Sequence, residues 1–120
     1  MPVADVLLEA GVVRMKFKRV SHHNLEDAKQ IVEAHNKLAD GRKCPVLANL
    51  RGVKVGADKA ARNHYVTTEA AKYKSAMAMV TESAFQRTLG ALFLYLSRPP
   101  YPSKMFKNEV DALQWLETYS

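Results

Sequence analysis

The chain has 120 residues and a net charge of +6, and 48% of its residues are hydrophobic. This length is typical of one domain and leaves no room for a multidomain enzyme. The composition is that of an ordinary globular protein, and one cysteine cannot form an internal disulfide, so fibrous, disordered and disulfide-stapled classes are excluded. We therefore expect a single domain over residues 1–120.

The sequence contains no segment that predicts export or membrane insertion. Asp5 and Glu9 fall where a secretory signal would be basic and then apolar. The longest apolar stretch, residues 89–96, is far shorter than the roughly 20 residues of a membrane-spanning helix. We expect a cytoplasmic protein without a membrane span.

The first half of the chain predicts two strands, a helix and a third strand. The apolar residues Val6 and Leu8 are followed by a short turn that contains Gly11, and apolar and basic residues then alternate over 13–18, which is typical of a β-hairpin. Asn24 can cap a helix that ends at Gly41. Its apolar stripe comprises Leu25, Ala28, Ile31, Val32, His35, Leu38 and Ala39. The apolar run Pro45 to Leu50, bounded by helix-breaking residues, predicts a buried central strand.

The second half predicts alternating helices and strands. Helical spacing of small residues runs from about Asp58 to Tyr73, with a β-branched interruption at 66–68. The remaining predictions are a strand at 76–80, a helix from Ser83 to about Leu96, a strand at 105–106 and a final helix capped by Asn108. The order β-β-α-β-α-β-α-β-α predicts an α/β domain with a mixed, largely parallel sheet that carries packed helices.

That order, with the strand and loop from Pro45 to Val53 leading into a helix at Asp58, resembles the STAS domain of anti-sigma factor antagonists. More narrowly, the chain is similar to small bacterial STAS-like proteins of unknown function that carry a Pro-Pro-Tyr-Pro segment, here residues 99–102, and a final Trp-Leu helix, here Trp115-Leu116. The resemblance implies a non-catalytic protein-binding module in bacterial regulation. Fold alone does not fix this function.

One departure from the resembled family concerns its phosphorylation switch. In the phospho-regulated antagonists an Asp before the helix is followed by a Ser or Thr that a kinase modifies. Here Asp58 is followed by Lys59, Ala60 and Ala61, and Asn49 stands where the strand would carry an Asp. Because these side chains offer no hydroxyl, we expect a module that lacks the usual phospho-acceptor.

Basic residues gather around the loop after the central strand. Residues 42–62 contain six basic residues and one acidic residue, Asp58. We expect a protein partner to be bound by Arg51, Lys54, Lys59 and Arg62. We do not expect nucleic-acid binding, because a groove for bases normally adds exposed aromatic residues and Phe17 falls on the inner face of its strand.

The sequence offers no constellation for catalysis, so we do not expect an enzyme. His22 and His23 adjoin a helix start, and a vicinal pair points its rings apart, so we expect a loop and no metal site. Cys44 enters a strand and is expected to be structural. We expect no cofactor.

The predicted helix at 83–96 is more apolar than one core-facing stripe requires. Phe85, Leu89, Leu92, Phe93 and Leu96 are expected to face inward, which leaves Leu94 and Tyr95 over. Three interpretations stay open: deep burial, a homodimer surface, or a cleft for a small apolar ligand or lipid. The last would use Phe85, Leu89, Phe93 and Tyr101.

Overall fold

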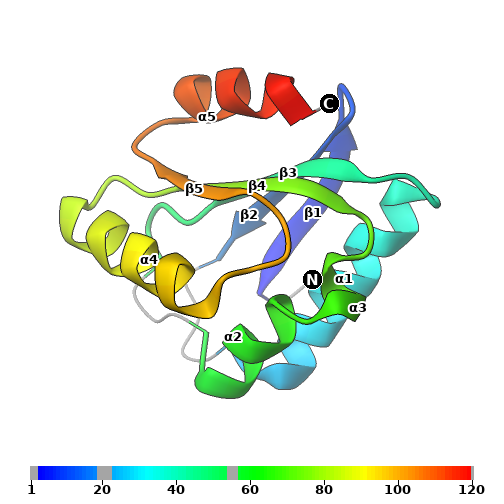
Figure 1. Ribbon diagram of the computed structural model, residues 1–120, viewed down its shortest axis with the longest axis horizontal. Helices are drawn as coiled ribbons and strands as arrows, with labels where there is room; N and C mark the ends of the chain where they lie inside the picture. The colour runs from blue at the N-terminus through cyan, green and yellow to red at the C-terminus, as the bar shows by residue number, and fades with distance from the viewer. Residues whose placement is uncertain (1–2, 19–22, 54–56, 120) are drawn as a thin grey trace.

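A twisted sheet runs through the middle of the molecule, with helices on both faces (Figure 1). The structure is a computed structural model that describes residues 3–18, 23–53 and 57–119. In these residues the sheet has five strands in the spatial order β1-β2-β3-β4-β5. β1 and β2 are antiparallel, and all later neighbours are parallel. The predicted α/β class with a mixed, largely parallel sheet is therefore confirmed.

The elements follow the predicted order. The strands are β1 Ala4–Glu9, β2 Val12–Phe17, β3 Cys44–Asn49, β4 Lys74–Val80 and β5 Ser103–Phe106. The helices are α1 Leu25–Ala39, α2 Lys59–Tyr65, α3 Thr68–Ala71, α4 Ala84–Ser97 and α5 Glu109–Leu116, followed by the short 3₁₀ turn η1 Glu117–Tyr119. The segment expected as an interrupted helix at 58–73 is thus two helices, α2 and α3.

Local chemistry sets the boundaries of these elements. Ala10 and Gly11 join β1 to β2, both with positive φ, as a tight hairpin turn requires. Each helix begins after a polar residue whose side chain accepts a hydrogen bond from a backbone N–H three residues on; these caps are Asn24, Asp58, Thr67, Ser83 and Asn108.

The two faces of the sheet carry different helices. In Figure 1, α5 lies alone on one face, whereas α1 to α4 lie on the other. Under α5 the core combines Ala112 and Leu116 of the helix with buried sheet residues: Leu47, Ala76, Ala78 and Val80. On the opposite face Ile31 and Ala39 of α1 pack with Val13 and Val46. Every residue of β3 is buried, as expected of the central strand.

Candidate functional site

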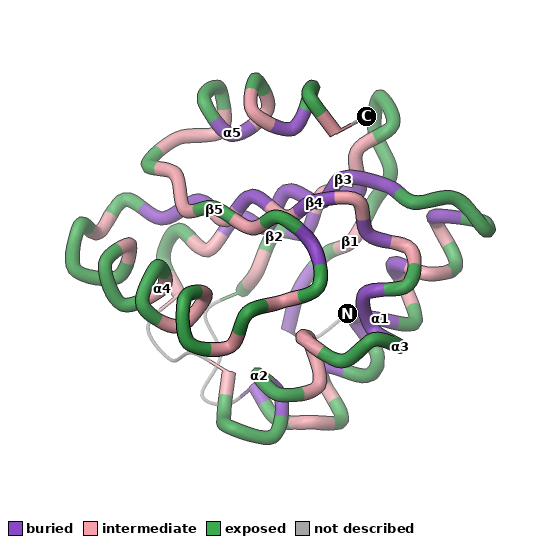
Figure 2. The backbone as a smooth tube through the Cα atoms, in the orientation of Figure 1, coloured by how far each residue is buried: buried purple, intermediate pink, exposed green. Residues whose placement is uncertain are grey.

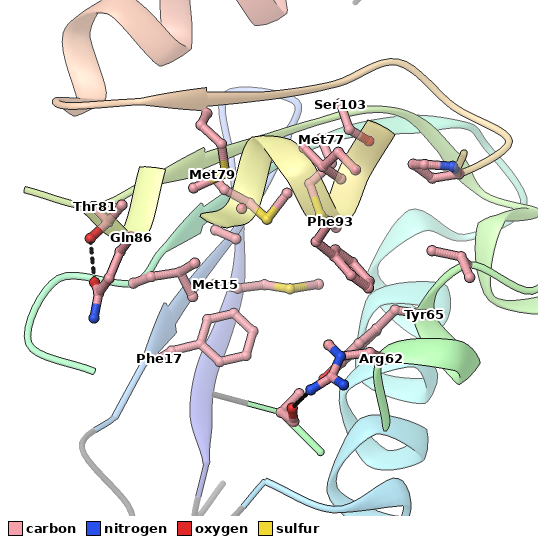
Figure 3. A pocket seen from close by; sticks show the side chains of 18 of the residues that line it. Met15, Phe17, Arg62, Tyr65, Met77, Met79, Thr81, Gln86, Phe93 and Ser103 are labelled. Carbon is pink, nitrogen blue, oxygen red and sulfur yellow. Dashed lines mark hydrogen bonds between the residues drawn. The ribbon is translucent and has the colours of Figure 1, made fainter. Parts of the chain in front are cut away.

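An apolar cavity of about 490 Å³ lies between α4 and the sheet. Its floor is formed by sheet residues: Met15, Phe17, Ala48, Met77, Met79 and Met105. Its cover is formed by α4 residues: Leu89, Gly90, Phe93 and Leu94. Figure 3 shows the side chains of Met15 and Phe93 pointing into the same space from opposite sides. The volume lies within the range of pockets that hold small molecules.

Helix α4 covers the cavity without being sunk into the core. None of its residues, all of which the structure describes, is buried, and Figure 2 shows no purple along it. It approaches the sheet closely at Gly90, where a Cβ atom would lie 2.8 Å from Sδ of Met105 on β5. Glycine therefore permits a near contact with the edge strand, while the space over the inner strands stays open.

Several α4 residues that were expected to face inward are exposed in the structure. Phe85, Leu92 and Leu96 are 62%, 53% and 70% exposed and lie outside the cavity lining, so their expected burial is wrong. Leu94, counted as surplus, faces the cavity. Tyr95 is exposed. The even spread of apolar residues around α4 gave no unique inward stripe, which is why periodicity misassigned it.

One end of the cavity is built from aromatic side chains. The Nε2 atom of His23 and the hydroxyl of Tyr65 lie 2.6 Å apart, and the His23 ring stacks on Phe17. The hydroxyl of Tyr101 donates a hydrogen bond of 3.2 Å to the carbonyl of Tyr65. Burial lowers the pKa of His23 and raises the pKa of Tyr101 to about 12. These rings are therefore neutral at neutral pH.

His23 and Cys44 agree with the expected loop and the expected structural thiol. His23 lies in the loop before α1, where it is 7% exposed and forms part of the cavity wall; His22 lies outside the described residues. Cys44 is a buried free thiol, consistent with the structural role expected. Across residues 3–18, 23–53 and 57–119, no group of three His, Cys, Asp or Glu side chains is arranged to hold a metal ion.

A buried lysine, Lys74, lines the same end of the cavity. It is 2% exposed, and its Nζ lies 5.7 Å from the ring centre of Tyr65 and 5.6 Å from that of Tyr101. The two aromatic faces favour a cation at this position. Burial lowers the pKa of Lys74 to about 8, so the ammonium form still predominates at pH 7. Sequence analysis did not single out this residue.

The side of the sheet on which Lys74 lies depends on a β-bulge. Along β4, Ala76, Ala78 and Val80 face α5, so simple alternation would place Lys74 with them. The pairing with β3 shifts, however: Cys44 pairs with Lys74, and Pro45 pairs with Ala76. The extra residue in β4 brings Lys74 onto the cavity side.

The basic residues expected to bind a protein partner do not form one continuous site. Arg51 lies at the end of β3, and its Nη1 is 3.8 Å from Oε1 of Glu82. Arg62 lines the cavity, with its guanidinium 5.9 Å from the ring centre of Phe93 and a hydrogen bond to the carbonyl of Ala57. Lys59 is exposed on α2. Lys54 lies outside the described residues.

The region that would hold a phosphorylation switch has structural roles here. The side chain of Asp58 accepts a hydrogen bond of 2.9 Å from the N–H of Ala61 and so caps α2. Asn49 is buried; its amide donates to Glu109, and its oxygen accepts from Arg51. In this chain Asp58 therefore caps the start of α2, and Asn49 joins the end of β3 to the first residue of α5.

This architecture defines a class, the α/β domains with a SpoIIAA-like (STAS-like) fold. An uncharacterised protein of the DUF3478 family with that fold, from Shewanella loihica PV-4, superposes with a TM-score of 0.72 and 17% identity, covering 95% of this chain and 93% of that one. At this identity the likeness shows the fold alone. The model of the family DUF7793, a domain of unknown function, matches residues 6–120, and the chain belongs to that family.

Two further comparisons add no functional information. A protein of unknown function from Arthrobacter sp. FB24 shares 24% identity over 94% of this chain and 98% of its own, but its TM-score is 0.33. Comparison with curated proteins gives no match. Within the described residues, no helix is long and apolar enough to cross a membrane.

Proposed function

We propose that this protein binds a small apolar or amphipathic molecule in the cavity beneath α4. The observation that carries the proposal is the cavity itself, about 490 Å³ in volume and lined mainly by methionine, leucine and aromatic side chains. Methionine suits such a role because its flexible, polarisable side chain adapts to ligands of different shape. Between the two functions expected from the sequence, the cavity favours ligand binding over a module that acts only through its surface.

The exposed cover favours the same function. A helix packed only as a structural layer would bury its apolar face, whereas α4 leaves Leu89 52% exposed at the cavity. A ligand beneath α4 would supply the missing apolar contacts, at about 25 cal/mol per Å² of surface removed from water. Ligand binding would therefore stabilise the folded protein.

Titration with Nile red, a neutral apolar dye, tests this function. We expect the wild type to bind the dye with a rise in fluorescence, and Leu94→Trp to weaken binding because the larger side chain fills the cavity. Leu92→Trp is the matched control, since Leu92 lies two residues away on the exposed side of α4 and outside the lining. A wild type that binds no dye contradicts the proposal, as does equal binding by both variants.

A protein-interaction role is the second candidate, favoured by the outer side of α4. Phe85, Tyr95 and Leu96 are 62%, 72% and 70% exposed there, and contiguous apolar surface of this kind is typical of interaction sites. In this function the module is non-catalytic and works without the usual phospho-acceptor, with a second copy or another protein covering α4. Sedimentation equilibrium of wild type and Leu96→Lys tests the homodimer: we expect a dimer that the charge disrupts, and a monomeric wild type contradicts it.

A further inference from the structure

We propose that the cavity takes a single-chain amphiphile with a carboxylate head, such as a fatty acid, bound with its head inward against Lys74. This inference rests on the proposed function and names the chemical class and orientation of the ligand. The observation behind it is the position of one buried amine, that of Lys74, in a cavity wall whose other polar side chains have hydrogen-bond partners.

Lys74 differs from the other polar side chains of the cavity in having no hydrogen-bond partner. Among the described residues, its Nζ is buried and unpaired. His23 and Tyr65 contact each other, Tyr101 donates to a backbone carbonyl, and Arg62 does the same. The ammonium group of Lys74 can donate three hydrogen bonds, and no group in the described part of the chain accepts one.

No acidic side chain in the described part of the chain forms an ion pair with Lys74. A buried cation without a counterion is unfavourable, and the two tyrosine rings offset this cost only in part. A ligand carboxylate would supply both the opposite charge and the hydrogen-bond acceptors. A carboxylate carries one negative charge, which matches the single positive charge of the amine.

The opposite end of the cavity is less suited to a charged head. There the hydroxyl of Thr81 donates 2.8 Å to Oε1 of Gln86 (Figure 3), and Nε2 of Gln86 donates to the carbonyl of Val53. These polar groups already satisfy one another. Between the two ends, Met77, Met79 and Phe93 provide an apolar path for the chain of the ligand.

The length of the cavity also fits an extended molecule. Lys74 is the first residue of β4, Thr81 directly follows its last residue, Val80, and both line the cavity. A strand rises about 3.3 Å per residue, so the two ends are roughly 20 Å apart. A long alkyl chain can run along β4 with its head at Lys74.

The test compares three probes of equal chain length: palmitate, hexadecanol and hexadecylamine. Each displaces Nile red from the wild type and from Lys74→Met. Lys72→Met is the matched control, because it removes the same charge from an exposed position two residues away. Arg62→Gln separates the buried amine from the guanidinium that also lines the cavity.

We expect the wild type to bind palmitate most tightly and hexadecylamine least. Lys74→Met should weaken palmitate binding by about 10- to 100-fold, the range of one charge-assisted hydrogen bond. It should leave hexadecanol binding in place, which also shows that the variant is folded. Lys72→Met should bind all three probes as the wild type does. If Lys74→Met does not fold, Lys74→Gln and the preference of the wild type for acid over alcohol provide the same test.

The results separate this inference from the proposed function. If neither Nile red nor hexadecanol binds the wild type, the cavity is not a ligand site and both fail. If hexadecanol binds as tightly as palmitate, the inference alone is overturned. The same holds if Lys74→Met keeps the preference for the acid, or if Arg62→Gln abolishes that preference while Lys74→Met does not.

Discussion

Helix α5 packs directly on one face of the sheet, whereas α4 stands over the other face with a cavity beneath it. Beneath α5 the strands carry the small side chains of Ala76 and Ala78. Leu116 of α5 packs in the same core and is 1% exposed. Beneath α4 the strands present methionines, and no α4 residue is buried. The comparison teaches that two helices in one fold can pack differently: α5 packs closely on the sheet and buries Leu116, whereas α4 leaves a cavity beneath it, in which we propose that a ligand binds.

The largest expected effect is on the free energy of unfolding, when one leucine of each helix is replaced by alanine. Leu116→Ala should lower the free energy of unfolding by about 2–5 kcal/mol, because it removes a buried side chain and leaves a cavity. Leu92→Ala on α4 deletes the same atoms from a side chain that is 53% exposed, and should cost less than about 1 kcal/mol. Urea denaturation of both variants measures the difference. Similar losses would mean that α4 is packed as tightly as α5.

The next effect concerns the part of the cavity face that is closely packed, at α1. His35 is fully buried, with Nε2 2.9 Å from the carbonyl oxygen of Tyr73. Burial lowers the pKa of His35 from 6.5 to about 4. Between these two pH values the unfolded chain binds a proton at His35 and the folded protein does not. Stability should therefore be complete above pH 6.5 and fall by about 3 kcal/mol as the pH drops to 4.

Urea denaturation at pH 7 and pH 4.5 measures this dependence on acidity. His35→Gln keeps an N–H donor for the Tyr73 carbonyl but does not titrate, so its loss of stability on acidification should be smaller than that of the wild type. The same loss in both proteins would show that His35 is not the group responsible.

The smallest expected effect concerns the two ion pairs of Arg14, which join β2 to β1 and to α5. Arg14 lies 3.0 Å from both Glu9 and Glu109, with partly exposed side chains. Arg14→Gln should lower stability by less than about 1 kcal/mol, because exposed pairs are weak and screened by salt. Lys16→Gln, two residues along the same strand, is the control. A loss of several kcal/mol would mean that electrostatics, and not Leu116, holds α5 in place.

Much of the fold could be predicted because its signals are local. Asn24, Ser83 and Asn108 cap helices where the sequence indicated, since capping depends only on neighbouring backbone. The interruption at 66–68 followed from β-branched residues in the same way. Packing of one element on another has no such local signal.

The candidate site shows where sequence reasoning ended. The surplus of apolar residues on α4 was visible, but periodicity could not tell whether the helix sinks into the core or covers a cavity. Lys74 was missed because it precedes the predicted strand at 76–80 and because alternation would place it on the α5 side. A lysine beside an apolar strand was the available signal, and interpreting it required the register of β4 against β3.

The bulge in β4 separates the position of a residue along this strand from the face on which its side chain lies. Ser75 is the extra residue between the pairs that join Lys74 and Ala76 to β3. In a regular strand that kept Ser75, two-residue alternation would turn the amine toward α5 and leave the aromatic end of the cavity uncharged. A chain of this fold without Ser75 would instead place the lysine directly before Ala76, where alternation puts its side chain on the cavity face with no bulge. A charged cavity wall is therefore compatible with two lengths of β4, the bulged strand seen here and a regular strand one residue shorter.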